Sequence, residues 1–385
     1  MITPAHRIAE VKEYYFSRKL KEIAQLNAEG QNIISLGIGS PDLPPSEATL
    51  KTLCEEALKS NAHGYQAYNG IPELRESFAS WYKKWYGVEL SASNEILPLI
   101  GSKEGILHIT LAFVNPGDQV LVPNPGYPTY TSLSKLLGAE VISYDLKEEN
   151  GWLPDFDALE KLDLSKVRIM WMNYPNMPTG TKANRSVFEK AVAFGLKHNI
   201  LIVNDNPYSF ILNNDLQSIL QLPNAKECCI EMNSLSKSHN MPGWRIGMVA
   251  AKPEFIDWII RVKSNIDSGM FKAMQLAAAE ALKAGNEWHE KMNETYSERR
   301  AIAEKIMKRL NCTFDPDQMG MFLWGKIPAD YESAEQLADR ILYDAKVFVT
   351  PGSIFGTNGE RYIRISLCCP SERLNEAYNR IDQNI

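Results

Sequence analysis

Short apolar runs alternate with longer amphipathic stretches through the middle of the chain, from about residue 95 to residue 251. Most of the apolar runs are nearly continuous, which is typical of strands covered on both faces of a sheet. The stretches between them carry apolar residues at helical spacing, as in 102–113 and 185–198. The pattern predicts a layered α/β unit with a mostly parallel sheet of seven strands. We place these strands at 95–101, 119–122, 140–146, 167–173, 200–205, 228–233 and 246–251.

The last hundred residues predict a second, smaller α+β unit. A helical pattern with dense charge on one face covers about 286–310, and we interpret it as a solvated connecting helix. Beyond it, short strands alternate with helices. The strands are expected at 321–327, 347–349 and 362–367, and the helices at 333–344 and 371–383.

Composition narrows the class of protein. The chain has 385 residues, a net charge of −6, 44% hydrophobic and 23% charged residues, which is typical of a globular protein of about two domains. The acidic balance argues against nucleic acid or an anionic membrane as the main partner. No apolar run approaches the ~18–20 residues of a membrane span, and the N-terminus lacks an apolar signal core.

Cysteine and histidine spacing points to a metal-free cytoplasmic protein. The six cysteines include two adjacent pairs in apolar runs and no CxxC spacing, which suits buried thiols in a reducing compartment. The six histidines are scattered without the spacing of metal ligands. We therefore expect a cytoplasmic location and no metal site.

The run SLSKSHNMPGWRIG, from Ser234 to Gly247, carries the most specific chemistry. Lysine forms a stable imine with an aldehyde, and Lys237 lies among donors suited to a phosphate, namely Ser234, Ser236 and Arg245. An aldehyde and a phosphate on one small molecule describe pyridoxal 5'-phosphate (PLP). The tetrapeptide SLSK alone is more typical of a surface lysine in a serine-rich turn, but the extension to Gly247 favours the cofactor.

This run resembles the lysine signature of the class I and II aminotransferases, which are PLP-dependent enzymes of fold type I. The resemblance implies the PLP-dependent transferase fold, with a large PLP-binding α/β domain at 46–285. It also implies that residues 1–45, which end in the turn-rich GSPDLPP, pack with 286–385 as a small α+β domain. The run SNIDSGMF at 264–271, together with DNPY, resembles the LL-diaminopimelate aminotransferases in particular.

Two segments match the places where this family binds the cofactor's phosphate and ring. Gly101, Ser102 and Lys103 follow a predicted strand and open a helix, so backbone N–H groups and the helix dipole face an anion. Ser102 is also a good N-cap, and the two roles are compatible. Tyr127, in NPGYPTY, matches the family's stacking aromatic residue, although a tyrosine that covers the edge of the core remains an alternative.

Two further segments match the groups around the pyridine ring. Asp205 ends the run ILIVND, where a carboxylate would keep the ring nitrogen protonated and make the cofactor an electron sink; the alternative is an Asx-turn or helix cap. Tyr208 would donate to the cofactor's phenolic oxygen. In NYPNMPTG, Met177 replaces the family's asparagine, and a thioether is a poor partner for that oxygen. Tyr208 would then hold it largely alone, or Asn176 would reach it.

The substrate side rests on the same resemblance. Arg364, in YIRISL, matches the clamp for the α-carboxylate, with an edge-strand arginine paired to a surface acid as the alternative. Gly39 matches the glycine that closes on the substrate, or is an ordinary turn glycine. Tyr15, with Phe355, suggests an aromatic wall for the substrate. Relatives use the tyrosine at the position of Tyr65 to reach the phosphate of the neighbouring subunit, which implies a homodimer with shared active sites; a core tyrosine is the alternative.

Together these matches predict an aminotransferase that moves an amino group between an L-amino acid and a 2-oxo acid by a ping-pong mechanism. Lys237 is the predicted general acid–base, assisted by Asp205 and Tyr208. A C–S β-lyase of the same fold would use the same residues and remains an alternative. A ligand sensor joined to a DNA-binding module is disfavoured, because the chain is acidic and shows no helix-turn-helix before residue 45. The sequence does not select among aspartate, alanine, methionine, aromatic and diaminopimelate substrates.

Overall fold

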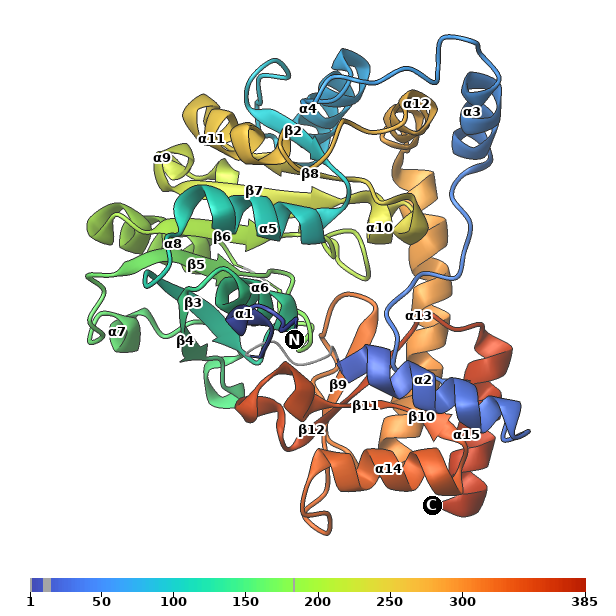
Figure 1. Ribbon diagram of the computed structural model, residues 1–385. Helices are drawn as coiled ribbons and strands as arrows, with labels where there is room; N and C mark the ends of the chain where they lie inside the picture. The colour runs from blue at the N-terminus through green and yellow to red at the C-terminus, as the bar shows by residue number, and fades with distance from the viewer. Residues whose placement is uncertain (1, 10–14, 183) are drawn as a thin grey trace.

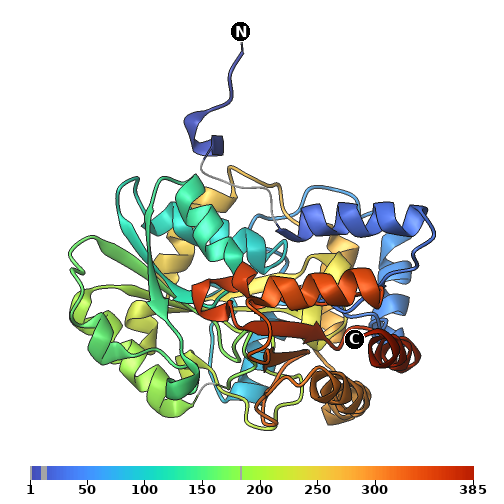
Figure 2. The ribbon, with the colours of Figure 1, turned by 90° about the horizontal axis from the view of Figure 1, so that it is seen from below.

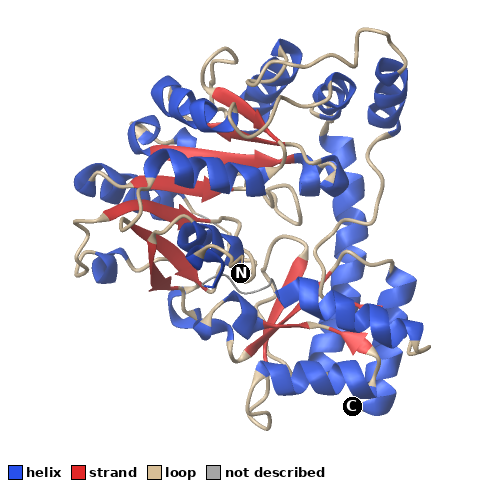
Figure 3. Ribbon diagram, viewed as in Figure 1, coloured by secondary structure: helices blue, strands red, loops and turns tan. Residues whose placement is uncertain are grey.

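The computed structural model describes residues 2–9, 15–182 and 184–385. One large sheet is covered by helices, and a smaller group of short strands and helices lies beside it (Figure 1). The strands, drawn in red in Figure 3, separate into these two groups. Among the described residues, no helix combines the length and the apolar character that crossing a bilayer requires.

The large sheet has seven strands in the order β2-β8-β7-β6-β5-β3-β4. Four of its strand pairs are parallel, and only β8 runs against its two neighbours, β2 and β7. The predicted mostly parallel sheet is therefore confirmed. Its strands are β2 (Ile96–Leu99), β3 (Gln119–Asn124), β4 (Glu140–Asp145), β5 (Val167–Met172), β6 (Leu201–Asp205), β7 (Cys229–Ser234) and β8 (Gly247–Ala250).

Side chains of the central strands alternate between two hydrophobic cores. In β5, Ile169 and Trp171 face the core that contains α5 (Ser102–Phe113), α6 (Pro128–Leu136) and α11 (Pro253–Lys263). Met170 and Met172 face the opposite core, which contains α4 (Pro72–Tyr86) and α8 (Arg185–His198). Since both faces are covered, every position in such a strand favours an apolar residue, which explains the continuous apolar runs of the sequence.

Local signals set the helix boundaries that the periodicity predicts. The Asn184 side chain accepts a hydrogen bond from the N–H of Val187 at 2.9 Å and caps the start of α8. Asn199, with φ of 56°, ends the same helix in the left-handed conformation that asparagine tolerates. These two residues account for the agreement between α8 and the predicted 185–198.

The smaller unit contains a three-stranded antiparallel sheet, β11-β12-β9, and the parallel pair β1-β10. In that pair Ile34 lies opposite Val347, so the N-terminal segment packs with the C-terminal one as expected. This pairing supports the proposed division into 46–285 and 1–45 with 286–385, which remains a proposal. The strands are β1 (Ile34–Ser35), β9 (Phe322–Lys326), β10 (Val347–Phe348), β11 (Thr350–Pro351) and β12 (Tyr362–Ser366).

The long helix α13 (Asn286–Arg309) does more than connect the units. Residues at helical spacing, among them Met292, Tyr296, Ile302 and Ile306, are buried along one side, and most of the charged residues lie on the other, with Arg299 as a buried exception. It is therefore a half-buried helix rather than a solvated connector. The turned view in Figure 2 shows residues 2–5 extending away from the rest of the chain, whereas α1 lies close to α6. The remaining α-helices are α1 (His6–Ala9), α2 (Tyr15–Ala28), α3 (Glu47–Ala57), α7 (Phe156–Leu159), α9 (Ala225–Cys228), α10 (Leu235–Ser238), α12 (Lys272–Ala281), α14 (Ala334–Asp344) and α15 (Ser371–Asn384).

Candidate active site

A cavity of about 600 Å³ lies at the carboxyl ends of the central parallel strands, where residues of the smaller unit close it. This end of a parallel sheet is the usual place for a ligand, because the loops that follow the strands converge there. Most of the predicted site residues line this one cavity, although they come from distant parts of the chain. They are Gly39, Ser102, Lys103, Tyr127, Asp205, Tyr208, Ser234, Ser236, Lys237, Arg245 and Arg364.

Lys237 lies on the short helix α10, directly after β7. Its ammonium group donates to the backbone carbonyl of Gly39, a residue of the N-terminal segment. Burial lowers the pKa of Lys237, and the nearby guanidinium groups of Arg364 and Arg245 lower it further. Both effects favour a neutral amine, which is the form that attacks a carbonyl and accepts a proton.

Asp205 is buried at the end of β6, with 5% of its surface exposed. Its Oδ2 accepts a hydrogen bond from the hydroxyl of Tyr130 at 2.9 Å, whereas its Oδ1 is buried without a hydrogen-bond partner. Burial raises the pKa of this carboxyl group to about 7, and the Tyr130 hydrogen bond opposes the rise. The unpaired oxygen is suited to a cationic N–H donor.

Gly101 and Ser102 form the turn at the start of α5. Gly101 has φ of +80°, and a Cβ built on it would lie 2.1 Å from Nη2 of Arg245. Only glycine lets this guanidinium group reach the helix N-terminus, so the backbone N–H groups, the dipole and a cation converge there. The hydroxyl oxygen of Ser102 is buried without a hydrogen-bond partner. Lys103, the next residue, also lines the cavity, and burial lowers its pKa.

Ser234 and Ser236 add two hydroxyl groups to the wall of the same cavity. Ser234 ends β7 and caps α10, and its Oγ accepts from the N–H of Ser236 at 3.1 Å. The two hydroxyl oxygens lie 2.9 Å apart. The short helix therefore fixes both hydroxyl groups near Lys237, with Ser234 three residues and Ser236 one residue before it.

Arg364 lies in β12 with only 3% of its surface exposed. Its guanidinium carbon lies 3.8 Å from the ring centre of Phe322 and 4.6 Å from that of Phe355. Nη2 donates to the carbonyl of Gly37 at 2.8 Å, and Nη1 lies 3.1 Å from the sulfur of Met177. The aromatic rings hold the planar group in a fixed orientation at the cavity wall, which suits recognition of a carboxylate.

Four predicted residues do not line this cavity, and one of them is Gly101, at the turn described above. Asn176 is buried, but its amide donates to the carbonyl of Asn173 at 3.2 Å and accepts from the Thr179 hydroxyl at 2.7 Å, so it is used within its own loop. Tyr65 is 94% exposed on the surface. Tyr15 lies in the wall of an adjoining cavity of about 940 Å³.

Two residues that the sequence did not single out are part of the site. Tyr130 holds Asp205 through its hydroxyl, and Asn173 donates from Nδ2 to the backbone carbonyl of Asp205 at 2.6 Å. Tyr130 follows Tyr127 by three residues, so a helix through both would have placed the two rings on one face. The two rings indeed meet edge to face, with centres 5.6 Å apart.

The groups in the cavity fit PLP. The buried Ser102 hydroxyl and the glycine turn under Arg245 suit the phosphate, and the unpaired oxygen of Asp205 suits the protonated ring nitrogen. The amine of Lys237 lines the same cavity and suits the aldehyde. Donors for an anion, an acceptor for a cation and a nucleophile are thus present together, which is the set of functional groups that this cofactor needs.

Comparison with known proteins agrees with this chemistry. The family described as aminotransferase class I and II matches residues 31–381. An LL-diaminopimelate aminotransferase of Dehalococcoides mccartyi is 42% identical over 377 residues, which cover 97% of each chain. The enzyme of the same name from Oleidesulfovibrio alaskensis is 41% identical, and the match covers 98% of each chain. These relatives give no support to the C–S lyase alternative.

Solved structures share the whole fold. Substrate-bound BacF from Bacillus subtilis has a TM-score of 0.95 at 35% identity, covering 100% of this chain and 98% of that one. An aromatic aminotransferase from Pyrococcus horikoshii has a TM-score of 0.86 at 30% identity, covering 92% and 95% of the two chains. The family match over residues 31–381 and the two relatives above 40% identity show that the chain belongs to the class I and II aminotransferases and is a PLP-dependent enzyme that transfers an amino group between an L-amino acid and a 2-oxo acid.

Proposed function

We propose that this aminotransferase acts on an amino acid with a second, distal carboxylate, and that LL-diaminopimelate is the first substrate to test. One observation supports this choice. The adjoining cavity of about 940 Å³ shares Phe16, Tyr127 and Phe355 with the active-site cavity, and its wall contains Arg18 and Lys135. The described residues that line it include no Asp or Glu. A long substrate held in the first cavity would extend toward these two cations, and the names of the relatives are consistent with such a substrate.

We assign the α-carboxylate of the substrate to Arg364, because its guanidinium group is buried, clamped between rings and turned to the cavity wall. PLP, when bound, supplies an aldehyde and an electron sink. Asp205 would hold the proton on the ring nitrogen, and Tyr130 and Asn173 keep Asp205 in place. Tyr208 would donate to the phenolic oxygen. The phosphate would be bound by Gly101, Ser102, Lys103, Ser234, Ser236 and Arg245, and Tyr127 would cover the ring.

The proton transfer is assigned to Lys237. Its lowered pKa favours the neutral amine, which is the form that accepts the proton from Cα of the substrate. With PLP bound, Lys237 would deliver this proton to the carbon of the cofactor's aldehyde group. Gly39 holds the amine through its carbonyl oxygen while no substrate is bound. Lys237→Ala should lose amino transfer, and borohydride treatment should no longer leave a pyridoxyl label on the protein. A labelled or active variant would contradict this role.

The substrate proposal is tested with two amino donors that differ only in the distal carboxylate. L-lysine is LL-diaminopimelate without that group, so the ratio of kcat/KM for the two donors with 2-oxoglutarate measures its recognition. A charge-assisted contact of ~1.5–3 kcal/mol predicts a preference of roughly tenfold or more for diaminopimelate. The Arg18→Ala/Lys135→Ala variant should lose most of this preference while alanine turnover stays constant. Equal use of lysine and diaminopimelate by the wild type would disprove the proposal.

We also propose a homodimer in which Tyr65 reaches the phosphate of the partner subunit's cofactor. Its exposure of 94% is exceptional for an aromatic residue, and Tyr68, Ile266 and Phe271 are exposed on neighbouring segments. Mixing inactive Lys237→Ala protein with inactive Tyr65→Ala protein should restore activity, because one site of each mixed dimer then has both residues. No restored activity, or an active monomer in sedimentation, would contradict the shared site.

A cytoplasmic location is the final part of the proposal. All six cysteines are free, and Cys228, Cys229, Cys312 and Cys369 are buried as thiols. Persistent free thiols are typical of a reducing compartment. Fractionation of cells that express the natural gene tests this directly, and recovery of the protein outside the cytoplasm would contradict it.

A further inference from the structure

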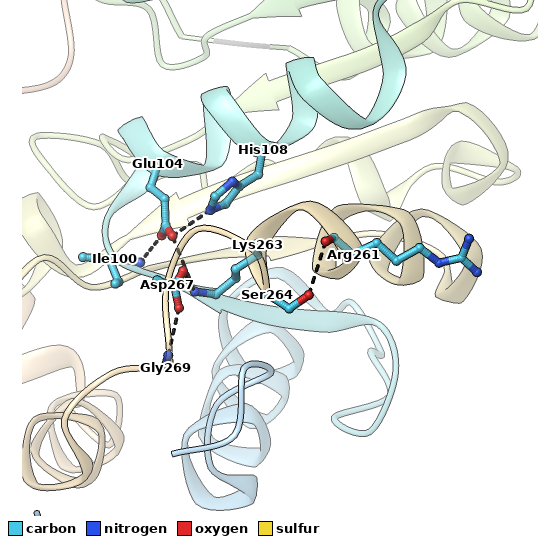
Figure 4. A network of polar contacts seen from close by, with 8 residues as sticks. All are labelled: Ile100, Glu104, His108, Arg261, Lys263, Ser264, Asp267 and Gly269. Carbon is cyan, nitrogen blue, oxygen red and sulfur yellow. Dashed lines mark hydrogen bonds and ion pairs between the residues drawn. The ribbon is translucent and has the colours of Figure 1, made fainter. Parts of the chain in front are cut away.

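A buried ion cluster lies against the helix that begins at the proposed phosphate site (Figure 4). Glu104 and His108 come from α5, one helical turn apart, and Lys263 is the last residue of α11. Asp267 follows in the loop after α11. The side chain of Lys263 is 1% exposed, its Nζ lies 3.4 Å from Oε1 of Glu104, and it also forms an ion pair with Asp267. The same Glu104 oxygen lies 2.7 Å from Nε2 of His108.

The cluster resembles a metal site but already contains its cation. Ligand atoms of Glu104, His108 and Asp267 lie within 4.8 Å of one another, which is close enough to hold an ion. The ammonium group of Lys263 forms ion pairs with both carboxylates and is itself buried. Two carboxylates at this depth need a positive charge between them, so the structure assigns that charge to the lysine.

Each carboxylate also holds one backbone N–H group with its second oxygen. Glu104 accepts from the N–H of Ile100, the residue directly before Gly101. The bond reaches back from the first turn of α5 to the chain that enters it, as in a helix cap. Glu104 therefore fixes the turn that presents Gly101 and Ser102 to the cavity.

On the other side of the lysine, Asp267 accepts from the N–H of Gly269 at 2.9 Å. Gly269 has φ of +83°, and a Cβ built on it would lie 2.7 Å from the carbonyl oxygen of Gln66 and 3.0 Å from that of Ala67. The ring of Phe271 stacks on His63 with centres 5.8 Å apart. The loop after α11 thus supports the segment that carries Tyr65.

We propose that Lys263 is a positioning residue for the cofactor's phosphate. Through Glu104 it holds the glycine turn of its own subunit, and through Asp267 it holds the segment from which Tyr65 extends toward the partner subunit. One buried ammonium group thereby fixes two parts of the phosphate site that lie far apart in the sequence. The inference rests on the proposed role of the 101–103 turn and of Tyr65 in binding the phosphate.

The test compares PLP with pyridoxal, which lacks the phosphate. Dissociation constants of both are measured by titration of the cofactor-free full-length protein. Lys263→Met should weaken PLP about tenfold, equivalent to about 1.4 kcal/mol, and leave pyridoxal within about twofold. General damage to the fold would weaken both ligands alike, and that result would overturn the proposal. Lys226→Met is the control. Nζ of Lys226 lies 2.8 Å from Oε1 of Glu95 in a partly buried ion pair that does not contact the turn.

A second variant and a second measurement keep the test independent of folding yield. Lys263→Met/Asp267→Asn removes one charge of each sign, and its asparagine still offers an oxygen to Gly269. In both Lys263 variants, hydrogen exchange at the amides of Ile100 and Gly269 should be faster than in the wild type. In Lys226→Met, exchange at these two amides should be unchanged. Unchanged exchange at both amides would refute the positioning role.

The same titrations separate this inference from the proposed function. If the wild-type protein binds pyridoxal as tightly as PLP, the proposed phosphate site is wrong, and so is this inference. If the wild type prefers PLP and Ser102→Ala reduces that preference, but Lys263→Met does not, then only the role of Lys263 is wrong.

Discussion

The buried carboxyl group of Asp205 predicts a measurable pH dependence of stability in the cofactor-free protein. Folding raises its pKa from the ordinary 3.8 to about 7, because burial disfavours the carboxylate. The folded state therefore binds a proton more tightly than the unfolded state. The stability that this proton contributes is fully present below pH 3.8, declines as the pH rises, and is lost above about pH 7.

The size of the effect follows from the two pKa values. The two pKa values differ by about three units, at about 1.4 kcal/mol per unit. The stability lost relative to low pH is therefore about 4 kcal/mol at pH 8 and about 2 kcal/mol at pH 5. Asp205→Asn removes the titrating group while it preserves the shape of the side chain. The free energy of unfolding of the variant, relative to the wild type, should then increase by about 2–3 kcal/mol between pH 5 and pH 8.

Urea unfolding of cofactor-free protein at several pH values measures this difference, and Glu231, another buried carboxyl group, cancels because both proteins contain it. Asp257→Asn, at an exposed position on α11, is the matched control and should show a flat difference. A flat difference for Asp205→Asn would refute the reasoning. In the holoenzyme the preferred form of Asp205 reverses, because a protonated ring nitrogen favours the carboxylate over the neutral acid. Asp205→Asn should therefore lose most of its activity.

Three further predictions concern neighbouring residues. Gly101→Ala should weaken PLP binding at least about tenfold, because the new Cβ would lie 2.1 Å from Nη2 of Arg245. Gly117→Ala is the control, since Gly117 has φ of +87° but no atom within 4 Å of the new Cβ. Equal losses of affinity in both variants would contradict a steric cause. Tyr130→Phe removes the hydrogen bond that lowers the pKa of Asp205, so the pH dependence of stability should move to higher pH; an unmoved curve in the same urea series would contradict it. Met177→Asn places an amide beside Arg364 and the expected phenolic oxygen, so the absorbance of the bound cofactor should titrate at a different pH, and superimposable curves would show that position 177 does not affect it.

The names of the structural neighbours indicate why the substrate needs a separate experiment. An aromatic aminotransferase and an alanine aminotransferase both share this fold, with TM-scores of 0.86 and 0.90. A shared fold therefore does not fix the substrate, which depends on the residues that line each site. In this chain those residues include two cations, Arg18 and Lys135.

The sequence by itself determined many of the elements and indicated the candidate reactive residues. Apolar periodicity placed α5 and α8 at 102–113 and 185–198, because helix spacing, caps and breakers act within a few residues. The motif around Lys237 and the strand end at Asp205 were recognisable for the same reason: the chemistry lies within one short segment. The departure at Met177 was visible too, and the structure brings its sulfur to Arg364.

The tertiary structure decided which polar groups serve the site and which serve the fold. Tyr130 and Asp205 are 75 positions apart, and their hydrogen bond depends on where β3 and β6 lie in the sheet. Asn176, three residues from Asn173, turns into its own loop, and no spacing rule distinguishes the two. Lys263 shows an ordinary helical pattern in the sequence, yet it is buried between two carboxylates. Hydrogen bonds and ion pairs act over a few ångströms, so only the packed chain determines which partners come within reach.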